Sequence, residues 1–155
     1  MIRVIKTSLL VFFVALVSNV SIAAEPPLFA LHAVVPKPTE TSELHSLPER
    51  EGRSEAILVE PAILLGQSAI KSAAVESGDE GPRIRLTFTE AGAKKFAEIT
   101  KEYLGKRLAI FVKGRAQSAP VIRDQILGGE VIISGNFSKD EAADLAAKLN
   151  ASVVK

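Results

Sequence analysis

Residues 83–105 read RIRLTFTEAGAKKFAEITKEYLG, and this stretch decides the fold. Apolar and polar residues alternate strictly over Arg83–Phe88, which predicts a strand with one buried and one solvated face. Thr89 is suited to cap a helix whose apolar residues follow at helical spacing, and Gly105 is suited to end it in the left-handed conformation. The stretch therefore predicts a half-buried strand followed directly by an amphipathic helix.

A second helix is predicted after Ser138. Ser138 and Glu141 have the spacing of a capping box, in which each side chain accepts a hydrogen bond from the backbone amide of the other residue. Apolar side chains then form one stripe along the helix, and this stripe is expected to face the core. The stripe consists of Ala142, Leu145, Ala146 and Leu149.

Strands fill the chain between and before these helices. The segment Leu108–Val112 (LAIFV) is apolar throughout, which predicts a central strand covered on both faces. Turns are predicted at Lys113-Gly114-Arg115 and at Gly128-Gly129. The other strands are predicted at Leu28–Val35, at Ala56–Glu60 closed by Pro61, at Ile70–Glu76, at Ala116–Ile122 interrupted by Pro120, and at Val131–Ser134. This order predicts an α+β fold with a largely antiparallel sheet and two helices packed on one face.

The N-terminus has the pattern of a secretory signal peptide. Two cations precede the apolar run Leu9–Val17, and small residues lead to a cleavage site between Ala24 and Glu25, with cleavage after Ala23 as the alternative. The run is much shorter than the roughly 20 apolar residues that span a membrane, and an uncleaved anchor is the competing interpretation. We therefore expect residues 1–24 to be removed, leaving a periplasmic protein with no stable membrane span.

The remaining chain is expected to have two parts. Residues 25–55 contain the first strand and a proline-rich loop, which is expected to be mobile. Residues 56–152 form the α+β domain proper. Cleavage would remove two cations and no anion, and so would shift the net charge from +1 to −1.

Composition excludes several classes of function. The 155 residues include no cysteine, which excludes disulfides and a thiol nucleophile. The 19 Lys+Arg and 18 Asp+Glu are nearly balanced, unlike the strongly basic chains that bind nucleic acid. His32 and His45 lack the spacing of a metal-binding pair. We therefore expect no catalytic residue, metal or cofactor. The less favoured alternative is a hydrolase with an unrecognised site. A deep pocket with converging Ser, Asp or Glu side chains would support that alternative.

Cationic residues form a candidate contact surface. A solvated face is the ordinary interpretation of such residues when the net charge is near zero. The alternative is a groove for an extended acidic or mixed-charge chain, held in part by exposed sheet edges. The candidate polypeptide-contact residues are Arg83, Arg85, Lys113, Arg115 and Arg123.

Five short motifs occur in an order that is typical of a known family. They are Leu86–Ala97 (LTFTEAGAKKFA), Gly105–Ile110 (GKRLAI), Ser118–Arg123 (SAPVIR), Ile126–Gly129 (ILGG) and Ile133–Phe137 (ISGNF). Together they resemble the head subdomain of the first periplasmic domain of SecD, a membrane subunit of the protein-export machinery, most closely over residues 83–150. The signature positions expected to serve backbone geometry and packing are Gly92, Gly105, Lys106, Arg107, Ser118, Pro120, Gly128, Gly129, Gly135, Asn136 and Phe137.

The resemblance implies a role without catalysis. The SecD periplasmic domain is thought to engage polypeptide emerging from the translocation channel, whereas its proton-driven transmembrane part has no expected counterpart here. We expect a non-enzymatic periplasmic module that binds a polypeptide or an envelope protein and assists protein export or envelope protein handling. The alternative is a partner-specific inhibitor or assembly factor of an envelope enzyme, which one stoichiometric partner would indicate.

Overall fold

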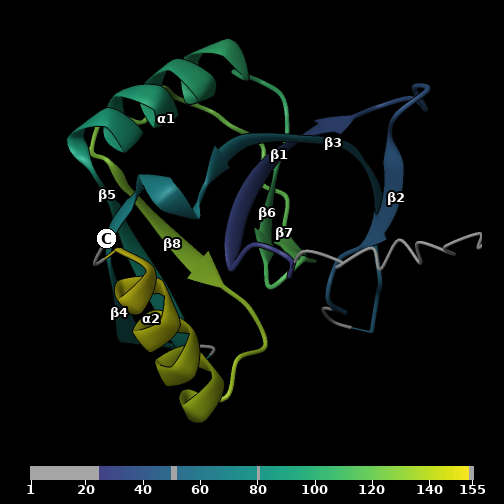
Figure 1. Cartoon of the computed structure of the whole chain (residues 1–155). Coiled ribbons are helices and arrows are strands. Elements are labelled where there is room, and N and C mark those ends of the chain that lie inside the picture. Colours follow the sequence, from purple (N-terminus) through teal and green to yellow (C-terminus); the bar gives the residue numbers. More distant parts are fainter. Residues whose placement is uncertain (1–24, 50–51, 80, 154–155) are drawn as a thin grey trace, which may run out of the picture.

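The structure, a computed structural model, describes residues 25–49, 52–79 and 81–153 (Figure 1). The predicted signal peptide lies outside these residues and stays a prediction. In chain order the elements are β1 (Phe29–Val35), β2 (Glu43–Ser46), β3 (Ala56–Gly66), the short 3₁₀ helix η1 (Gln67–Ala69), β4 (Ile70–Gly78), β5 (Gly81–Phe88), α1 (Glu90–Glu102), β6 (Leu108–Val112), β7 (Arg115–Ser118), β8 (Glu130–Ser134) and α2 (Lys139–Val153).

The described strands form two antiparallel sheets, and the predicted α+β fold with two packed helices is confirmed. The strand order is β2-β3-β1-β6-β7 in the larger sheet and β4-β5-β8 in the smaller one. Helix α2 packs along β4 and β5, and α1 packs beside β3 and β5, as Figure 1 shows. The sequence pattern predicts one largely antiparallel sheet and does not indicate that the strands divide between two.

The main core lies between the two sheets and beneath the helices. The side chains of Ile84, Leu86 and Phe88 on β5 enter it, and the rings of Phe88 and Phe96 are 5.0 Å apart. The predicted apolar stripe of α2 is buried in the same core. Ile84 and Leu86 have no exposed surface, and complete burial of such side chains stabilises a fold by roughly 1.5–3 kcal/mol each. The strand β5 therefore anchors both helices.

Strand β6 is buried on both faces, as its apolar sequence predicts. Leu108, Ile110 and Val112 face the main core, while Ala109 and Phe111 face a second, smaller core. The larger sheet curls around this second core, so that its two outer strands, β2 and β7, approach each other. β6 is therefore the structural centre of the larger sheet.

Two expectations for the proline-containing segments are wrong. Pro61 does not end a strand, because β3 continues to Gly66. The register with β1 shifts twice near this proline, which shows that the residues around it bulge out of the ladder, where a missing N–H group is tolerated. Segment 36–55 is not loop throughout, because it contains β2, which pairs with the first residues of β3.

The start of α1 confirms the predicted cap. The Gly92 amide donates a hydrogen bond to Oγ1 of Thr89 at 3.0 Å. Thr89 in turn donates from its backbone amide to the carbonyl of Ala69 at 2.8 Å. A Cβ atom on Gly92 would lie only 2.5 Å from this carbonyl oxygen. The glycine therefore allows the helix to begin directly against η1.

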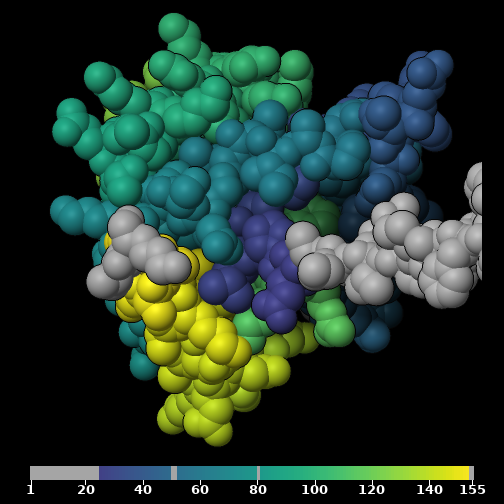
Figure 2. All heavy atoms as spheres, viewed as in Figure 1, coloured from purple at the N-terminus to yellow at the C-terminus, as the bar shows by residue number. Residues whose placement is uncertain are grey.

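One side chain bonds the backbone at the middle of the outer edge of β4. Asn150 on α2 accepts a hydrogen bond from the Ala73 amide at 2.8 Å and donates one to the Ala73 carbonyl at 2.9 Å. The side-chain amide thus takes the place of a neighbouring strand, and in Figure 2 the yellow atoms of α2 adjoin the teal atoms of this sheet. Uncovered edges pair with other chains, so this contact protects the sheet as well as fixing the helix.

We expect Asn150→Ala to lower the free energy of unfolding by roughly 1–3 kcal/mol, because the two backbone groups of Ala73 lose their partners. Urea denaturation measures this change. Ser152→Ala is the matched control, because Ser152 bonds only to Leu149 within the same helix; its expected cost is below about 0.5 kcal/mol. Equal losses of stability in the two variants would contradict the prediction.

Candidate functional site

Two clefts meet along β7 and form one groove, which we call the β7 groove. Their volumes are about 720 Å³ for the first cleft and about 630 Å³ for the second. Pro48 and Gln117 line both clefts, which makes them contiguous. The first cleft is also lined by His45, Ser46, Val112, Lys113, Gly114, Arg115, Ala116, Asn136, Phe137, Glu141 and Leu145. The second is also lined by Leu47, Arg53, Glu55, Arg107, Ile110, Ser118, Ala119, Pro120, Val131, Ile132 and Ser134.

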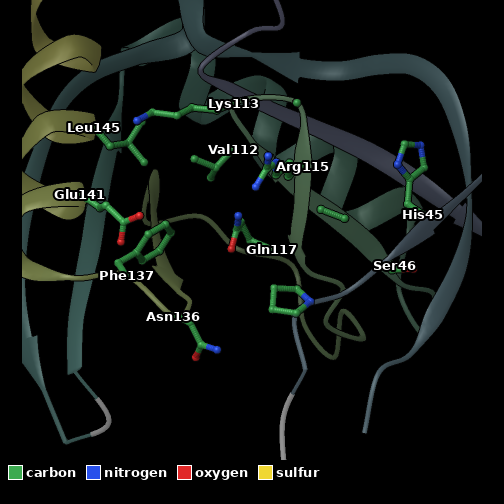
Figure 3. Close-up of a pocket in the computed structure, with 13 residues that line it drawn as sticks. His45, Ser46, Val112, Lys113, Arg115, Gln117, Asn136, Phe137, Glu141 and Leu145 are labelled. Atoms are coloured by element: carbon green, nitrogen blue, oxygen red, sulfur yellow. The ribbon is translucent and has the colours of Figure 1, made fainter.

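Helix α2 supplies one wall of the first cleft. The predicted capping box forms at its start: the Ser138 amide donates to Oε2 of Glu141 at 2.8 Å, and the Glu141 amide donates to Oγ of Ser138 at 3.2 Å. The hydrogen bonds from Ser138 lower the pKa of Glu141. Figure 3 shows Glu141 and Phe137 on this side of the space, across from Arg115 and Gln117.

Strand β2 supplies the opposite wall through His45 and Ser46. The ring of His45 packs edge-on against Phe111, with the ring centroids 4.8 Å apart, and so holds β2 over the second core. Adjacent residues of a strand point to opposite faces, so His45 and Ser46 do not form a nucleophile–base pair. No group of three or more metal-ligating side chains is positioned to hold a metal ion in the part of the chain that the structure describes.

Arg107 fixes one end of the second cleft. Its Nε donates to the Ala119 carbonyl at 2.7 Å, and its guanidinium forms an ion pair with both carboxylate oxygens of Glu55. The hydrogen bonds of this pair lower the pKa of Glu55 and raise the pKa of Arg107. Arg107 therefore joins the segment before β3 to the segment after β7, and its charge is engaged within the protein.

The predicted cationic residues do not form one surface. Lys113 and Arg115 line the first cleft, at the turn between β6 and β7. Arg83 and Arg85 lie on β5, and Arg123 lies after β7, and none of these three lines either cleft. The candidate residues are divided because Arg83 and Arg85 lie on the smaller sheet, whereas Lys113 and Arg115 lie where the chain turns from β6 into β7 in the larger sheet.

Ion pairs engage two of these cations. Arg85 contacts Glu76 through Nε at 2.6 Å and Glu130 through Nη1 at 2.8 Å. Lys113 Nζ lies 3.0 Å from Oδ2 of Asp144. Each of these ion pairs partly neutralises the cation, which weakens its attraction for an external anionic ligand.

Arg115 differs from these residues. It is exposed, it lines the first cleft, and it has no ion-pair partner among the described residues. Arg123 is likewise exposed and without an ion pair there, but it lies outside the groove. Arg83 packs against Gly78, with its Nε buried and without a hydrogen-bond partner. Arg115 is therefore the predicted contact residue whose position best suits binding.

Several signature positions border the groove. Ser118 and Pro120 line the second cleft, and Asn136 and Phe137 line the first. Gly135 lies between Ser134, which lines the second cleft, and Asn136, which lines the first. A Cβ atom on Gly135 would come within 3.0 Å of Oε1 of Gln117. The glycine thus keeps space where β8 passes close to β7.

Other signature positions lie away from the clefts. Gly105 and Gly129 have φ values of +75° and +65°, which glycine adopts without strain. The prediction that Gly105 ends α1 is wrong, because the helix is capped at Tyr103 and the Gly105 amide donates to the Ile122 carbonyl at 2.8 Å. Lys106 Nζ lies 5.4 Å from the centroid of the Tyr103 ring. Nothing in the described structure requires glycine at position 128.

These features define a class of protein: a small α+β module with an open groove bordered by the outer strands of two sheets. None of its described helices combines the length and the apolar character needed to cross a membrane. The family model of the SecDF P1 head subdomain matches residues 42–154. The chain belongs to this family, which confirms the resemblance seen in the sequence.

Individual relatives agree with this assignment. The SecD subunit of Magnetococcus marinus is 35% identical over 127 residues, covering 81% of this chain and 24% of that protein. The SecDF subunit of Thermus thermophilus is 45% identical over 89 residues, covering 57% of this chain and 12% of that protein. The chain therefore spans about a quarter or less of these relatives.

Solved structures show the same fold. A structure of SecDF, described as a membrane component that enhances protein export, matches with a TM-score of 0.63 and 29% identity, covering 82% of this chain and 63% of the other. SecDF in its super-membrane-facing form also gives a TM-score of 0.63, with 31% identity, and covers 79% of this chain and 18% of the other.

The Arg85 ion pairs predict a pH dependence of stability. Arg85 lowers the pKa of Glu76, chiefly through their hydrogen bond, so Glu76 contributes stability above its unfolded pKa and loses it as pH falls through the lower, folded pKa. We expect Arg85→Gln to reduce the loss of unfolding free energy between pH 7 and pH 3, measured by urea denaturation. Arg123→Gln removes the same charge without breaking an ion pair and is expected to keep the wild-type slope. Identical slopes in both variants would refute this role of Arg85.

Proposed function

We propose that the protein is a periplasmic polypeptide-binding module that assists protein export. The observation that carries this proposal is the β7 groove, in which apolar, amide and charged side chains border the outer strands of two sheets. The predicted signal peptide supports the location. Membership of the SecDF P1 head family supports the link to export, since SecDF is described as enhancing that process.

The lining of the groove suits a ligand of variable sequence. Phe137 and Leu145 offer apolar contacts in the first cleft, and Ile132 and Pro48 offer them in the second. Contacts of this kind, together with free backbone groups, hold an extended chain without requiring one particular sequence. Among the described residues that line the groove, His45 and Ser46 lie on opposite faces of β2 and so do not form the nucleophile–base pair that a hydrolase needs.

Arg115 provides the first test of this function. The probe is reduced, carboxymethylated α-lactalbumin, an acidic protein that stays unfolded. We expect Arg115→Gln to weaken its binding about twofold to fivefold at low salt, the effect of an exposed charge pair, because the free guanidinium of Arg115 faces the first cleft. Fluorescence anisotropy of the labelled probe measures the dissociation constant, and the difference should shrink as salt screens the charges.

Arg123→Gln is the matched control, since it removes an exposed cation outside the groove. We expect its affinity to equal that of the wild type within error. An absence of binding by the wild-type protein up to high micromolar concentration would refute the proposed function. Equal weakening in both variants would show that net charge, rather than the groove, determines binding.

A further inference from the structure

The two described sheets have four outer strands, and three of them are short, covered or interrupted. On β4, Asn150 of α2 bonds both backbone groups of Ala73 at the middle of the edge; β2 has only four residues, and Pro120 follows soon after β7. Strand β8 reads EVIIS, with neither lysine nor proline, and Ile132 at its middle is 41% exposed. Proteins normally protect an apolar outer strand of this kind, because its free backbone groups pair with other chains.

The hydrogen-bond pattern shows which groups of β8 are free. The Phe88 amide on β5 donates to the Gly129 carbonyl at 2.8 Å, just before β8 begins. Hydrogen-bonded pairs alternate along an antiparallel ladder, so Val131 and Ile133 bond to β5, while the amide and carbonyl of Ile132 point away from it. The free groups of Ile132 therefore face the second cleft, which Ile132 lines.

The opposite edge of the sheet checks this pattern independently. The same alternation makes the backbone groups of Ala73 on β4 point away from β5. The structure agrees, since both the amide and the carbonyl of Ala73 form hydrogen bonds with Asn150, on the side away from β5. The sheet thus has one edge at which a side chain bonds the backbone groups of Ala73, and one edge at which the equivalent groups of Ile132 border a cleft.

We propose that an extended segment of the polypeptide substrate adds to β8 as a fourth strand of the smaller sheet, paired through the backbone of Ile132. This inference rests on the proposed function and gives it a binding mode. The edge is recessed, because β7 and the segment around Pro48 form the facing wall of the second cleft. A single extended strand enters such a space, whereas β8 of a second folded copy, recessed in the same way, does not reach it.

The binding mode explains how varied sequences would be held. Backbone hydrogen bonds supply affinity that does not depend on side chains, and alternate side chains of the segment contact the cleft walls. The pairing is assigned to Ile132 because it is the residue at the middle of β8 whose backbone groups point away from β5 and which lines the second cleft. Proline-rich segments are expected to bind poorly, because they lack the amides that this pairing uses.

Two measurements on the wild-type protein test the proposal. Peptides that tile reduced, carboxymethylated α-lactalbumin are screened by fluorescence anisotropy, and the tightest binder is resynthesised with N-methyl groups at alternate residues. Methylation of one alternate set is expected to weaken binding about tenfold or more, and methylation of the other set is expected to be tolerated. At saturation with the unmethylated peptide, exchange of the Ile132 amide hydrogen is expected to slow about tenfold or more.

A protein variant gives an independent test. Ile132→Pro removes an amide that no strand of the fold uses, and proline is tolerated at such positions of outer strands. We expect it to lose most peptide binding, while the control Ile132→Val, which keeps the amide, retains it. If circular dichroism shows that Ile132→Pro is unfolded, the amide-exchange and N-methylation measurements on the wild-type protein determine whether strand addition occurs.

The outcomes separate this inference from the proposed function. Binding that ignores the methylation pattern and leaves Ile132 exchange unchanged would overturn strand addition and leave the polypeptide-binding function intact. An absence of any binding would overturn both. Concentration-dependent dimerisation that protects the Ile132 amide without peptide would overturn the proposal in favour of pairing between two copies.

Discussion

Burial of one face of β5 holds the rest of the structure in place. Ile84 and Leu86 are fully enclosed, and the surrounding core is shared by both helices and by the larger sheet. Because this face is buried in the core, only the solvated surfaces and the outer strands of the domain are accessible to other molecules. The groove follows from the same arrangement, since β7 and β8 are outer strands of two sheets that share a core and line a common cleft.

Features that depend on neighbouring residues could be predicted from the sequence. The alternation of β5, the cap at Thr89 and the capping box of Ser138 and Glu141 all involve residues within five positions of one another, and the structure contains each of them. The full burial of β6 could be predicted as well, because an apolar segment without alternation has no face suited to water.

Features that depend on distant residues could not be predicted in this way. The contact between Asn150 and Ala73 joins positions 77 residues apart, and a single asparagine near the end of a helix indicates no partner.

The candidate site also depends on residues that are distant in sequence. Glu76 and Glu130 engage Arg85 only because three strands lie side by side, and the two clefts exist only where segments from both sheets converge. The sequence could name the cationic residues but could not separate free ones from paired ones.

The contact between Asn150 and Ala73 also has a consequence for the order in which the chain acquires its structure. A chain that emerges from a ribosome or a membrane channel exposes its N-terminal segments first, so β4 is available long before α2. Its edge then stays open until 77 further residues have emerged and the asparagine can reach it. During that interval β4 can pair with β5, yet it can also pair with another nascent chain. The edge of β4 is therefore most open to aggregation while the chain is still emerging, and the backbone groups of Ala73 gain their partner only when α2 docks.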